Sequence, residues 1–328
     1  MASANTYNVA GNKEQLTDLL TILEPETTPI SSMIPKTKAT ASFVEFQVDS
    51  LSNPSFEGVS EGEDISAFSN KAENRARLGN YIQIFRREWK VSDVQQLVST
   101  AGVPNEAANS SAKTLSELKL DIESAICSDQ DRQAEDGVNV FKTRGLGNWI
   151  SSTGPTDVPA AYRVPAGHVD STIMANTTES TFNSVLQSRF EKVGSKDDLY
   201  LVAGPTLKRT ITFFSRADTS SNDSTLSVSQ PAGDKALTLT VQRYDGDYGL
   251  VHILPSTFNG RTSGGDLDAT SRHRGYLFSP SHLGLAVLQA ESNEQLQDES
   301  GGKRGFAKAM ASLIVKSPLG LCKFDATS

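Results

Sequence analysis

The chain has 328 residues, enough to bury a substantial core and to form about two domains. Its mean hydropathy of −0.34 and its 37% hydrophobic residues are typical of a soluble protein. The formal net charge of −8 argues against a protein that binds duplex DNA by neutralising its phosphates, although it is compatible with a local basic patch.

The two cysteines, Cys127 and Cys322, exclude a disulfide framework or a cysteine-based zinc site within one chain. We expect both as small buried residues of a chain that folds in a reducing cytoplasm. The N-terminal residues lack the basic and apolar regions of a signal peptide, and no run approaches the ~18 apolar residues of a membrane span. We therefore expect synthesis in the cytoplasm and no membrane segment.

The first 40 residues are not typical of the start of a compact domain. A short helix is predicted at about residues 16–23, where four leucines share one face. Pro25, Pro29 and Pro35 then interrupt any longer element and bias the preceding residues towards extended backbone. We interpret this segment as an arm that has to lie against another surface.

A long β-hairpin is predicted next. Val44, Phe46 and Val48 alternate with polar residues, and a second extended run covers residues 75–91. The connecting segment, residues 52–74, is acidic, whereas the return strand is basic, which predicts partly electrostatic contacts. A two-stranded ribbon is marginal in isolation, so another subunit is the simplest source of its stability. The charged residues that we expect at subunit contacts are Glu61, Glu63, Asp64, Lys71, Arg75, Arg77, Arg86 and Arg87.

A long amphipathic helix is predicted at residues 104–130, with Pro104 in a first helical position. Apolar residues recur at three- and four-residue steps, at Ala108, Ala112, Leu115, Leu118 and Ile122. Charged residues fall mostly on the other face, at Lys113, Glu117, Lys119, Asp121 and Glu123. The single apolar stripe predicts a helix of about 40 Å that lies along a surface and faces its own domain.

The remaining elements predict a mixed α/β core. A short helix is expected at residues 92–99, and a helix from Glu179 ends at Gly194. The other expected elements are a strand at 198–203, a helix at 206–214, an exposed loop at 215–235 and strands at 236–243, 249–254, 283–288 and 309–316. Residues 290–303 are interpreted as a polar linker.

No side-chain pattern predicts catalysis, a cofactor or a metal. There is no Gly-x-Ser-x-Gly elbow for a serine hydrolase. The four histidines lack the spacing of metal sites and are interpreted as surface or structural residues: His168, His252, His273 and His282. We therefore do not expect an enzyme.

Four short patterns have a functional and a structural interpretation, and the structural one is favoured for each. Residues 204–209 are either a phosphate loop, although the second glycine is missing, or a plain strand-to-helix turn. Residues 245–248 are either cation ligands or a hairpin turn, and residues 144–147 either a phosphate nest or an exit from the long helix. Residues 272–274 are either a contact for nucleic acid or a neighbouring chain, or a solvated loop.

Several stretches occur in an order that resembles the major capsid proteins of tailed bacteriophages with the Hong Kong 97-type fold. They are residues 7–14 (Tyr-Asn-Val-Ala-Gly-Asn-Lys-Glu), 28–30 (Thr-Pro-Ile), 36–40 (Lys-Thr-Lys-Ala-Thr), 80–86 (Asn-Tyr-Ile-Gln-Ile-Phe-Arg), 113–123 (Lys-Thr-Leu-Ser-Glu-Leu-Lys-Leu-Asp-Ile-Glu), 278–283 (Phe-Ser-Pro-Ser-His-Leu) and 309–319. The resemblance spans nearly the whole chain and rests on the joint order of these stretches rather than on one motif.

The resemblance implies an α+β fold of four parts. These are an N-terminal arm at residues 1–40, an extended β-hairpin loop at 41–91, a peripheral domain with a long spine helix at 92–145 plus 286–328, and an axial α/β domain at 146–285. In such a fold the extended loop lies over a neighbouring subunit.

The implied function is that of a major capsid protein whose pentamers and hexamers tile an icosahedral head around double-stranded DNA. The expected location is the virion, after synthesis and assembly in the host bacterial cytoplasm, with a portal, optional cement proteins and a separate scaffolding protein, since no scaffolding segment precedes the arm. Some relatives link a loop lysine to an asparagine of a neighbour; Lys71 is the lysine near this tip, but an ordinary surface lysine is favoured. The alternative is a decoration, tail-tube or encapsulating-compartment subunit.

Overall fold

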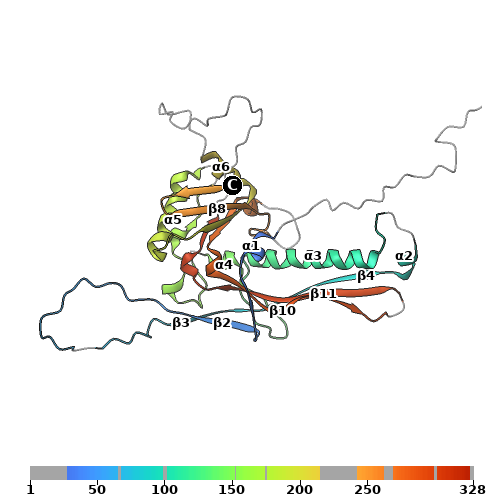
Figure 1. Cartoon of the computed structure of the whole chain (residues 1–328), viewed down its shortest axis with the longest axis horizontal. Coiled ribbons are helices and arrows are strands. Elements are labelled where there is room, and N and C mark those ends of the chain that lie inside the picture. The colour runs from blue at the N-terminus through green and yellow to red at the C-terminus, as the bar shows by residue number, and fades with distance from the viewer. Residues whose placement is uncertain are drawn as a thin grey trace, which may run out of the picture. The chain divides into compact units, whose positions relative to one another are not determined.

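The computed structural model describes residues 28–65, 68–98, 102–151, 153–173, 176–214, 242–261, 269–298 and 301–325 (Figure 1). The chain divides into two compact units. Within the described residues, the smaller unit contains Arg86–Leu118 and Glu291–Lys308, and the larger unit contains the rest. Both contain helices and strands, which confirms the predicted α+β class.

The larger unit contains a six-stranded sheet in the order β5-β12-β9-β6-β8-β7. These strands are β5 (Val169–Asp170), β6 (Leu199–Ala203), β7 (Arg243–Gly246), β8 (Gly249–Pro255), β9 (Arg274–Phe278) and β12 (Cys322–Asp325). β6 and β8 are parallel, whereas β9 is antiparallel to both β6 and β12. The sheet therefore brings together segments that lie more than 150 residues apart.

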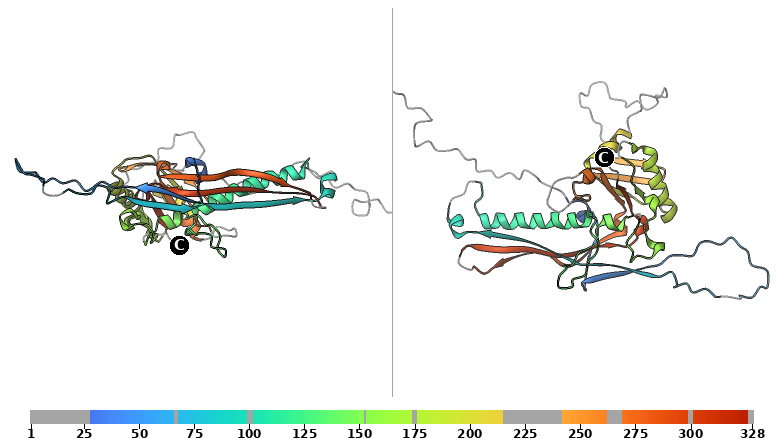
Figure 2. Two further views of the ribbon diagram at one scale, coloured as in Figure 1. Left: turned by 90° about the horizontal axis from the view of Figure 1, so that it is seen from below. Right: turned by 180° about the vertical axis from the view of Figure 1, so that it is seen from behind.

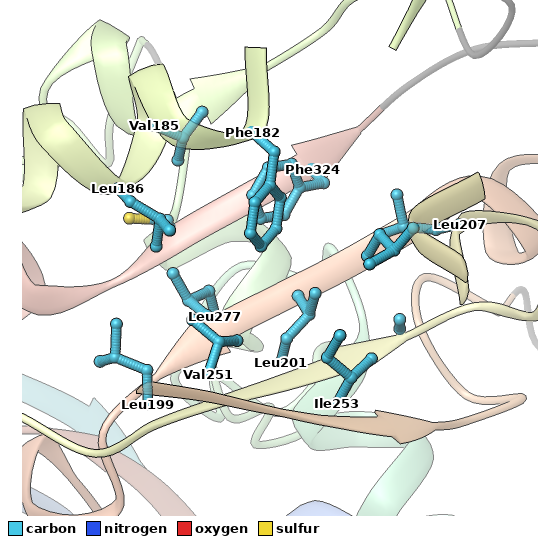
Figure 3. Packing of buried hydrophobic residues seen from close by; sticks show 13 residues of the cluster. Phe182, Val185, Leu186, Leu199, Leu201, Leu207, Val251, Ile253, Leu277 and Phe324 are labelled. Carbon is cyan, nitrogen blue, oxygen red and sulfur yellow. The ribbon is translucent and has the colours of Figure 1, made fainter. Parts of the chain in front are cut away.

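Two helices, α5 (Glu179–Val193) and α6 (Pro205–Phe214), pack against this sheet through apolar side chains (Figure 3). The Thr178 hydroxyl accepts a hydrogen bond from the Thr181 N–H at the start of α5, and Gly194 ends the helix with a φ of 68°. The core residues are Phe182, Val185, Leu186, Leu199, Leu201, Ala203, Leu207, Ile211, Val251, Ile253, Leu277, Cys322 and Phe324. Burial raises the pKa of the Cys322 thiol to about 12, which confirms the expectation of a buried cysteine.

The larger unit also contains a separate two-stranded sheet, formed by β2 (Phe43–Val48) and β3 (Ala76–Tyr81). The strands are antiparallel, with Phe43 opposite Tyr81 and Val48 opposite Ala76. The two ribbon views in Figure 2 show the long connection that leaves the far end of this pair. The hairpin prediction is thus confirmed for these two strands.

A four-stranded sheet has the order β1-β10-β11-β4, with β1 (Lys36–Lys38), β4 (Gln83–Val91), β10 (Leu283–Leu296) and β11 (Lys303–Val315). Two predictions fail here. β4 is hydrogen-bonded to β11 rather than to β2, so the basic return strand leaves the hairpin after Tyr81. Residues 290–303 are mostly strand rather than linker, because their hydrogen bonds to a neighbouring strand do not require an apolar face.

The remaining elements are short. They are α1 (Pro29–Met33), α2 (Asp93–Leu97), α4 (Leu146–Trp149), α7 (Ala269–His273), η1 (Ala160–Tyr162), η2 (Ala166–His168), η4 (Pro280–His282) and η5 (Pro318–Gly320). α2 confirms the predicted helix at 92–99. Of the strand predicted at 236–243, only residues 242 and 243 are described, and β7 begins at residue 243. The helix predicted at 16–23 and the loop at 215–235 lie outside the described residues. No described helix is long and apolar enough to span a membrane.

The long helix is α3 (Glu106–Cys127). It begins two residues after Pro104 because the Asn105 side chain accepts a hydrogen bond from the Ala108 N–H, 3.2 Å away. Leu118 and Ile122 are buried and Leu115 is half-buried, which confirms the apolar stripe for the second half of the helix. The stripe prediction is wrong at Ala108 and Ala112, which are exposed. The predicted polar face of the helix is wrong at one residue, since Glu123 is fully buried.

Glu123 is buried because it binds the first turn of α1. Its two carboxylate oxygens accept hydrogen bonds from the N–H groups of Ile30 and Ser31, each 2.8 Å away. These N–H groups have no partner within the short helix, and they lie at its positive end. Burial nevertheless raises the pKa of Glu123 above its ordinary value. The contact joins residues more than 90 positions apart, which helical periodicity does not reveal.

We expect Glu123→Ala to lower the free energy of unfolding by about 3 kcal/mol, because two buried N–H groups lose their acceptor. Glu123→Gln, which retains one acceptor oxygen, should lose less. Glu117→Ala, at an exposed position of the same helix, should change stability by less than about 0.5 kcal/mol. Urea denaturation measures all three, and equal losses for Glu117→Ala and Glu123→Ala would contradict the assignment.

Candidate assembly surface

The loop between β2 and β3 carries large apolar side chains in full contact with solvent. Leu51, Phe56 and Val59 are 97%, 101% and 79% exposed, and Ile65 and Phe68 are 72% and 89% exposed. A concentration of exposed apolar residues on one segment is typical of an interaction surface. The loop is therefore the first candidate for contact with another chain.

The same loop is acidic, as predicted. Glu61, Glu63 and Asp64 are exposed, and Glu63 shapes the local turn because its carboxylate accepts a hydrogen bond from the Ser60 N–H at 3.1 Å. Lys71 is exposed in a second turn. Arg75 pairs with Asp49 at 3.3 Å, and this ion pair joins the two ends of the loop next to the strands. Arg77 is exposed on β3.

The two remaining predicted contact residues, Arg86 and Arg87, lie elsewhere. Both are exposed on β4, and Arg86 pairs with Glu88 at 2.9 Å. Because β4 belongs to the four-stranded sheet, the acidic tip and these two basic residues do not share one element. The predicted charge cluster therefore separates into a loop surface and a strand surface.

A groove of about 490 Å³ lies at the strand surface. Its apolar lining comes from Trp89, Leu296 and Phe306. A Cβ at Gly305 would lie 2.7 Å from the Trp89 ring, so the glycine lets the ring lie against the backbone. The charged lining residues are Arg86, Glu88, Lys90 and Arg304. Sequence reasoning missed most of this groove because Leu296 and Arg304 belong to segments that carry no apolar alternation.

The base of the β2–β3 hairpin is held by a buried polar side chain, that of Asn80. Its amide nitrogen donates to Thr143 Oγ1 at 2.9 Å, to the Arg144 carbonyl at 3.2 Å and to the Leu313 carbonyl at 2.8 Å. Its amide oxygen accepts from the Arg144 N–H at 2.8 Å. One side chain thus joins β3 to two distant segments and satisfies its own hydrogen-bonding groups.

Arg144 is the next buried group in this network. Its side chain is 1% exposed, and its guanidinium pairs with Asp131 and Asp157, both at 2.6 Å, while it lies 4.9 Å from the centre of the Trp149 ring. Two carboxylates already neutralise this cation. The phosphate-nest interpretation of residues 144–147 is wrong because a nest needs free backbone N–H groups, whereas those of Arg144, Gly145 and Gly147 donate to Asn80 Oδ1 and to the Gln130 and Ser128 carbonyls.

Burial raises the pKa of Asp157, but the hydrogen bond from Arg144 and the positive charges of Arg144 and Arg132 outweigh burial, so the pKa lies below its ordinary value of 3.8. Nη2 of Arg132 lies 2.9 Å from Oδ2 of the same carboxylate. Asp157 is thus shared by two arginines that come from the segment following α3. The fold therefore stabilises the ionised form of the Asp157 carboxylate.

The interpretation of residues 272–274 as a solvated loop is wrong at Arg274. This residue begins β9, is 5% exposed, and its guanidinium pairs with Asp129 and Asp325. Asp245 and Gly246 end β7 and residues 247–248 form the turn to β8, so the favoured hairpin interpretation is confirmed. Gly204 is required for close packing, since a Cβ there would lie 2.4 Å from the Ser271 carbonyl oxygen.

Two of the histidines have structural contacts in the described residues. His168 is buried, with Nδ1 3.1 Å from the Leu321 carbonyl, and burial lowers its pKa. His252 stacks on Tyr200 with the ring centres 4.9 Å apart. Among the described residues, no three His, Cys, Asp or Glu side chains are placed to hold a metal ion.

The whole chain matches one family of proteins: residues 3–327 fit the model of the SU10 major capsid protein family. The chain belongs to this family. Comparison with curated protein sequences gives no match.

Solved structures of phage and phage-like shells share the fold. The capsid of the cyanophage P-SCSP1u is 16% identical, with a TM-score of 0.62 over 97% of this chain and 94% of that one. The capsid of an empty GTA particle is 12% identical, with a TM-score of 0.63 over 99% and 100% of the two chains. A structure of Mycobacterium phage Bobi is 13% identical, with a TM-score of 0.60 over the full length of both chains. The resemblance to tailed-phage capsid proteins of the Hong Kong 97 type is confirmed, and the protein is a capsid subunit.

We expect Asp157→Asn to destabilise the subunit by about 2 kcal/mol near neutral pH, because buried Arg144 loses one of its two carboxylates. The folded-state pKa of Asp157 is lowered, so its contribution is present above 3.8 and is lost as the pH falls through the lower folded value. The difference from wild type should therefore shrink in acid.

Urea denaturation from about pH 7 to about pH 3 measures this dependence. Asp198→Asn, at an exposed carboxylate, is the matched control and should have little effect at any pH. A stability difference for Asp157→Asn that stays constant into acid would contradict the assigned charge.

Proposed function

We propose that this capsid subunit assembles as pentamers and hexamers into the icosahedral head of a tailed phage, around double-stranded DNA, and that it has no catalytic activity. The family match over residues 3–327 supports a capsid role for the whole chain rather than for one domain. The loop residues that remain exposed and apolar in a single subunit support contacts between subunits.

The subunit contact that we propose places the β2–β3 loop of one copy on the β4–β11 groove of another. The loop offers exposed apolar residues and the carboxylates of Glu61, Glu63 and Asp64. The groove offers an apolar lining with three basic residues and one acidic residue. Apolar contact would supply most of the affinity, and opposite charge would select the orientation. We place Lys71, Arg75 and Arg77 at the margins of the same contact.

We propose the same four parts as the resemblance implies, with two changes: the extended loop ends before β4, and β12 joins the axial domain. The arm is residues 1–40, the extended loop begins at 41, and the peripheral domain contains α3 with β10 and β11. The axial domain contains the six-stranded sheet and includes β12, which is hydrogen-bonded to β9 although it follows β11 in the sequence.

The proposed location is the virion, with synthesis and assembly in the cytoplasm of a bacterial host. The proposed partners are other copies of this chain, a separate scaffolding protein, a portal and optional cement proteins. The DNA would be enclosed without recognition of its sequence, since the chain carries a net charge of −8.

Negative-stain electron microscopy of the purified full-length chain, expressed with and without a co-expressed scaffolding protein, tests the proposal. We expect closed shells with icosahedral symmetry. Rings or tubes would favour the alternative of a tail-tube subunit, and binding to preformed shells without self-assembly would favour a decoration protein. A monomer with measurable catalytic turnover would overturn the proposal.

We expect the double substitution of Arg86 and Arg87 to Glu to impair assembly, because it places negative charge beside the surface that would receive the acidic loop. The same reversal at Lys192 and Lys196, which are exposed residues of the larger unit, changes the net charge equally and is the control. Light scattering would follow assembly at low and high salt. Normal shells from the Arg86/Arg87 variant at both salt concentrations would contradict the electrostatic part of the contact.

We expect Lys71 to remain an ordinary surface lysine in mature particles. A denaturing gel of those particles should then contain only monomer-sized bands. A ladder of covalent multimers that disappears in Lys71→Ala would instead assign it to a crosslink between subunits.

A further inference from the structure

Arg132 contacts both strands of the β2–β3 hairpin and the body that supports it. Its Nη1 donates a hydrogen bond to the Gly79 carbonyl on β3 at 2.8 Å. Its guanidinium carbon lies 5.2 Å from the centre of the Phe43 ring on β2, and its Nη2 lies 2.9 Å from Asp157. We propose that Arg132 is a positioning residue that sets the direction in which the extended loop leaves the subunit.

The hairpin needs such a contact because β2 and β3 form a two-stranded sheet of their own within the described chain. Two strands without a third are marginal and free to twist. Asn80 attaches β3 to the body through its hydrogen bonds to Thr143, Arg144 and Leu313. Val44 and Phe46 of β2 pack against the apolar cluster that contains Ala286 and Ile314. Arg132 adds a contact that reaches both strands at once, and it therefore opposes twisting of the strand pair relative to the body.

The hairpin residues that lie next to Arg132 leave room for its guanidinium. A Cβ at Gly79 would lie 2.5 Å from the Phe43 ring, so the glycine allows that ring to lie across the strand pair beneath the guanidinium. Phe43 also packs on Tyr81 with the ring centres 4.5 Å apart. The planar guanidinium therefore binds a carbonyl on one strand and an aromatic face on the other.

Arg132 is itself held in place by the buried network. Asp157 pairs with Arg144, whose side chain is 1% exposed, so the carboxylate cannot follow the hairpin. The chain of contacts thus runs from the buried Arg144 through Asp157 and Arg132 to the two strands. This inference rests on the proposed function, since a fixed loop direction matters because the loop must meet a second copy of the chain.

A distance measurement within one subunit tests the proposal directly. Spin labels at Gln47→Cys on β2 and Ser184→Cys on α5 would occupy exposed positions in the same unit. The native Cys127 and Cys322 are fully buried and would remain unlabelled. Labelled full-length chain, diluted with unlabelled chain, gives the distance distribution between the two sites by pulsed electron resonance.

We expect a narrow distribution for the parent and a broadened or shifted one for Arg132→Ala, with little change in the melting temperature. Arg132→Lys, which keeps the charge but not the planar fork, should give an intermediate width. Arg163→Ala is the matched control, because Arg163 binds the carbonyls of Thr156 and Val158 beside Asp157 but does not contact the hairpin in the described structure. Its distribution should equal that of the parent.

An Arg132→Ala distribution identical to the parent's would overturn the proposal, as would equal broadening in Arg163→Ala. If Arg132→Ala fails to fold, Arg132→Gln, which keeps part of the stem over Phe43, replaces it with the same expectation. Electron microscopy of the same samples tests the proposed assembly separately from the role of Arg132. A parent that forms no shells contradicts the proposed assembly, whereas the distance result judges Arg132 alone.

Discussion

The buried guanidinium of Arg144 is the group on which the local architecture around the hairpin depends. A cation taken out of water is costly unless it is paired and hydrogen-bonded, and Arg144 meets that condition through Asp131, Asp157 and the face of Trp149. Its main-chain N–H and carbonyl bind the Asn80 side chain at the same time. One residue thus joins the segment after α3 to β3, and through Asp157 it also fixes Arg132.

This arrangement gives the subunit a firmly attached hairpin with an exposed end. The base of the hairpin is tied by buried polar contacts, whereas the loop beyond it presents apolar side chains to water, among them Phe56 and Phe68. A monomer gains nothing from that exposure, but a subunit of a shell can bury those side chains against a neighbour. A hairpin with a fixed base and an exposed apolar loop is consistent with a subunit that binds other copies of itself.

Two sequence predictions failed because a polar residue was assigned to solvent when its partner lay far along the chain, and a third failed because backbone pairing was overlooked. Glu123 falls on the charged face of α3 by periodicity but binds N–H groups of α1. Arg274 lies in a charged tripeptide but pairs with Asp129 and Asp325. Residues 290–303 carry no apolar alternation, yet most of them form strands, since strand hydrogen bonds use the backbone and not the side chains. The spacing of polar and apolar residues along a segment does not reveal which distant group a polar side chain or a strand will bind.

What the sequence by itself determined is the set of elements whose signals are local. The alternation of Val44, Phe46 and Val48 and the stripe containing Leu118 and Ile122 identify their elements correctly, because burial on one face leaves a period in the residues. Gly194 identifies the end of α5 because it adopts the left-handed backbone that stops a helix. The order of several short stretches was also enough to recognise the capsid fold. Only the tertiary structure decided which strands pair, that β4 leaves the hairpin, and that Arg132, Asp157 and Arg144 form one chain of contacts. Those features depend on distances between residues that the chain brings together, and a charge or an amide in a sequence does not specify which partner it will meet.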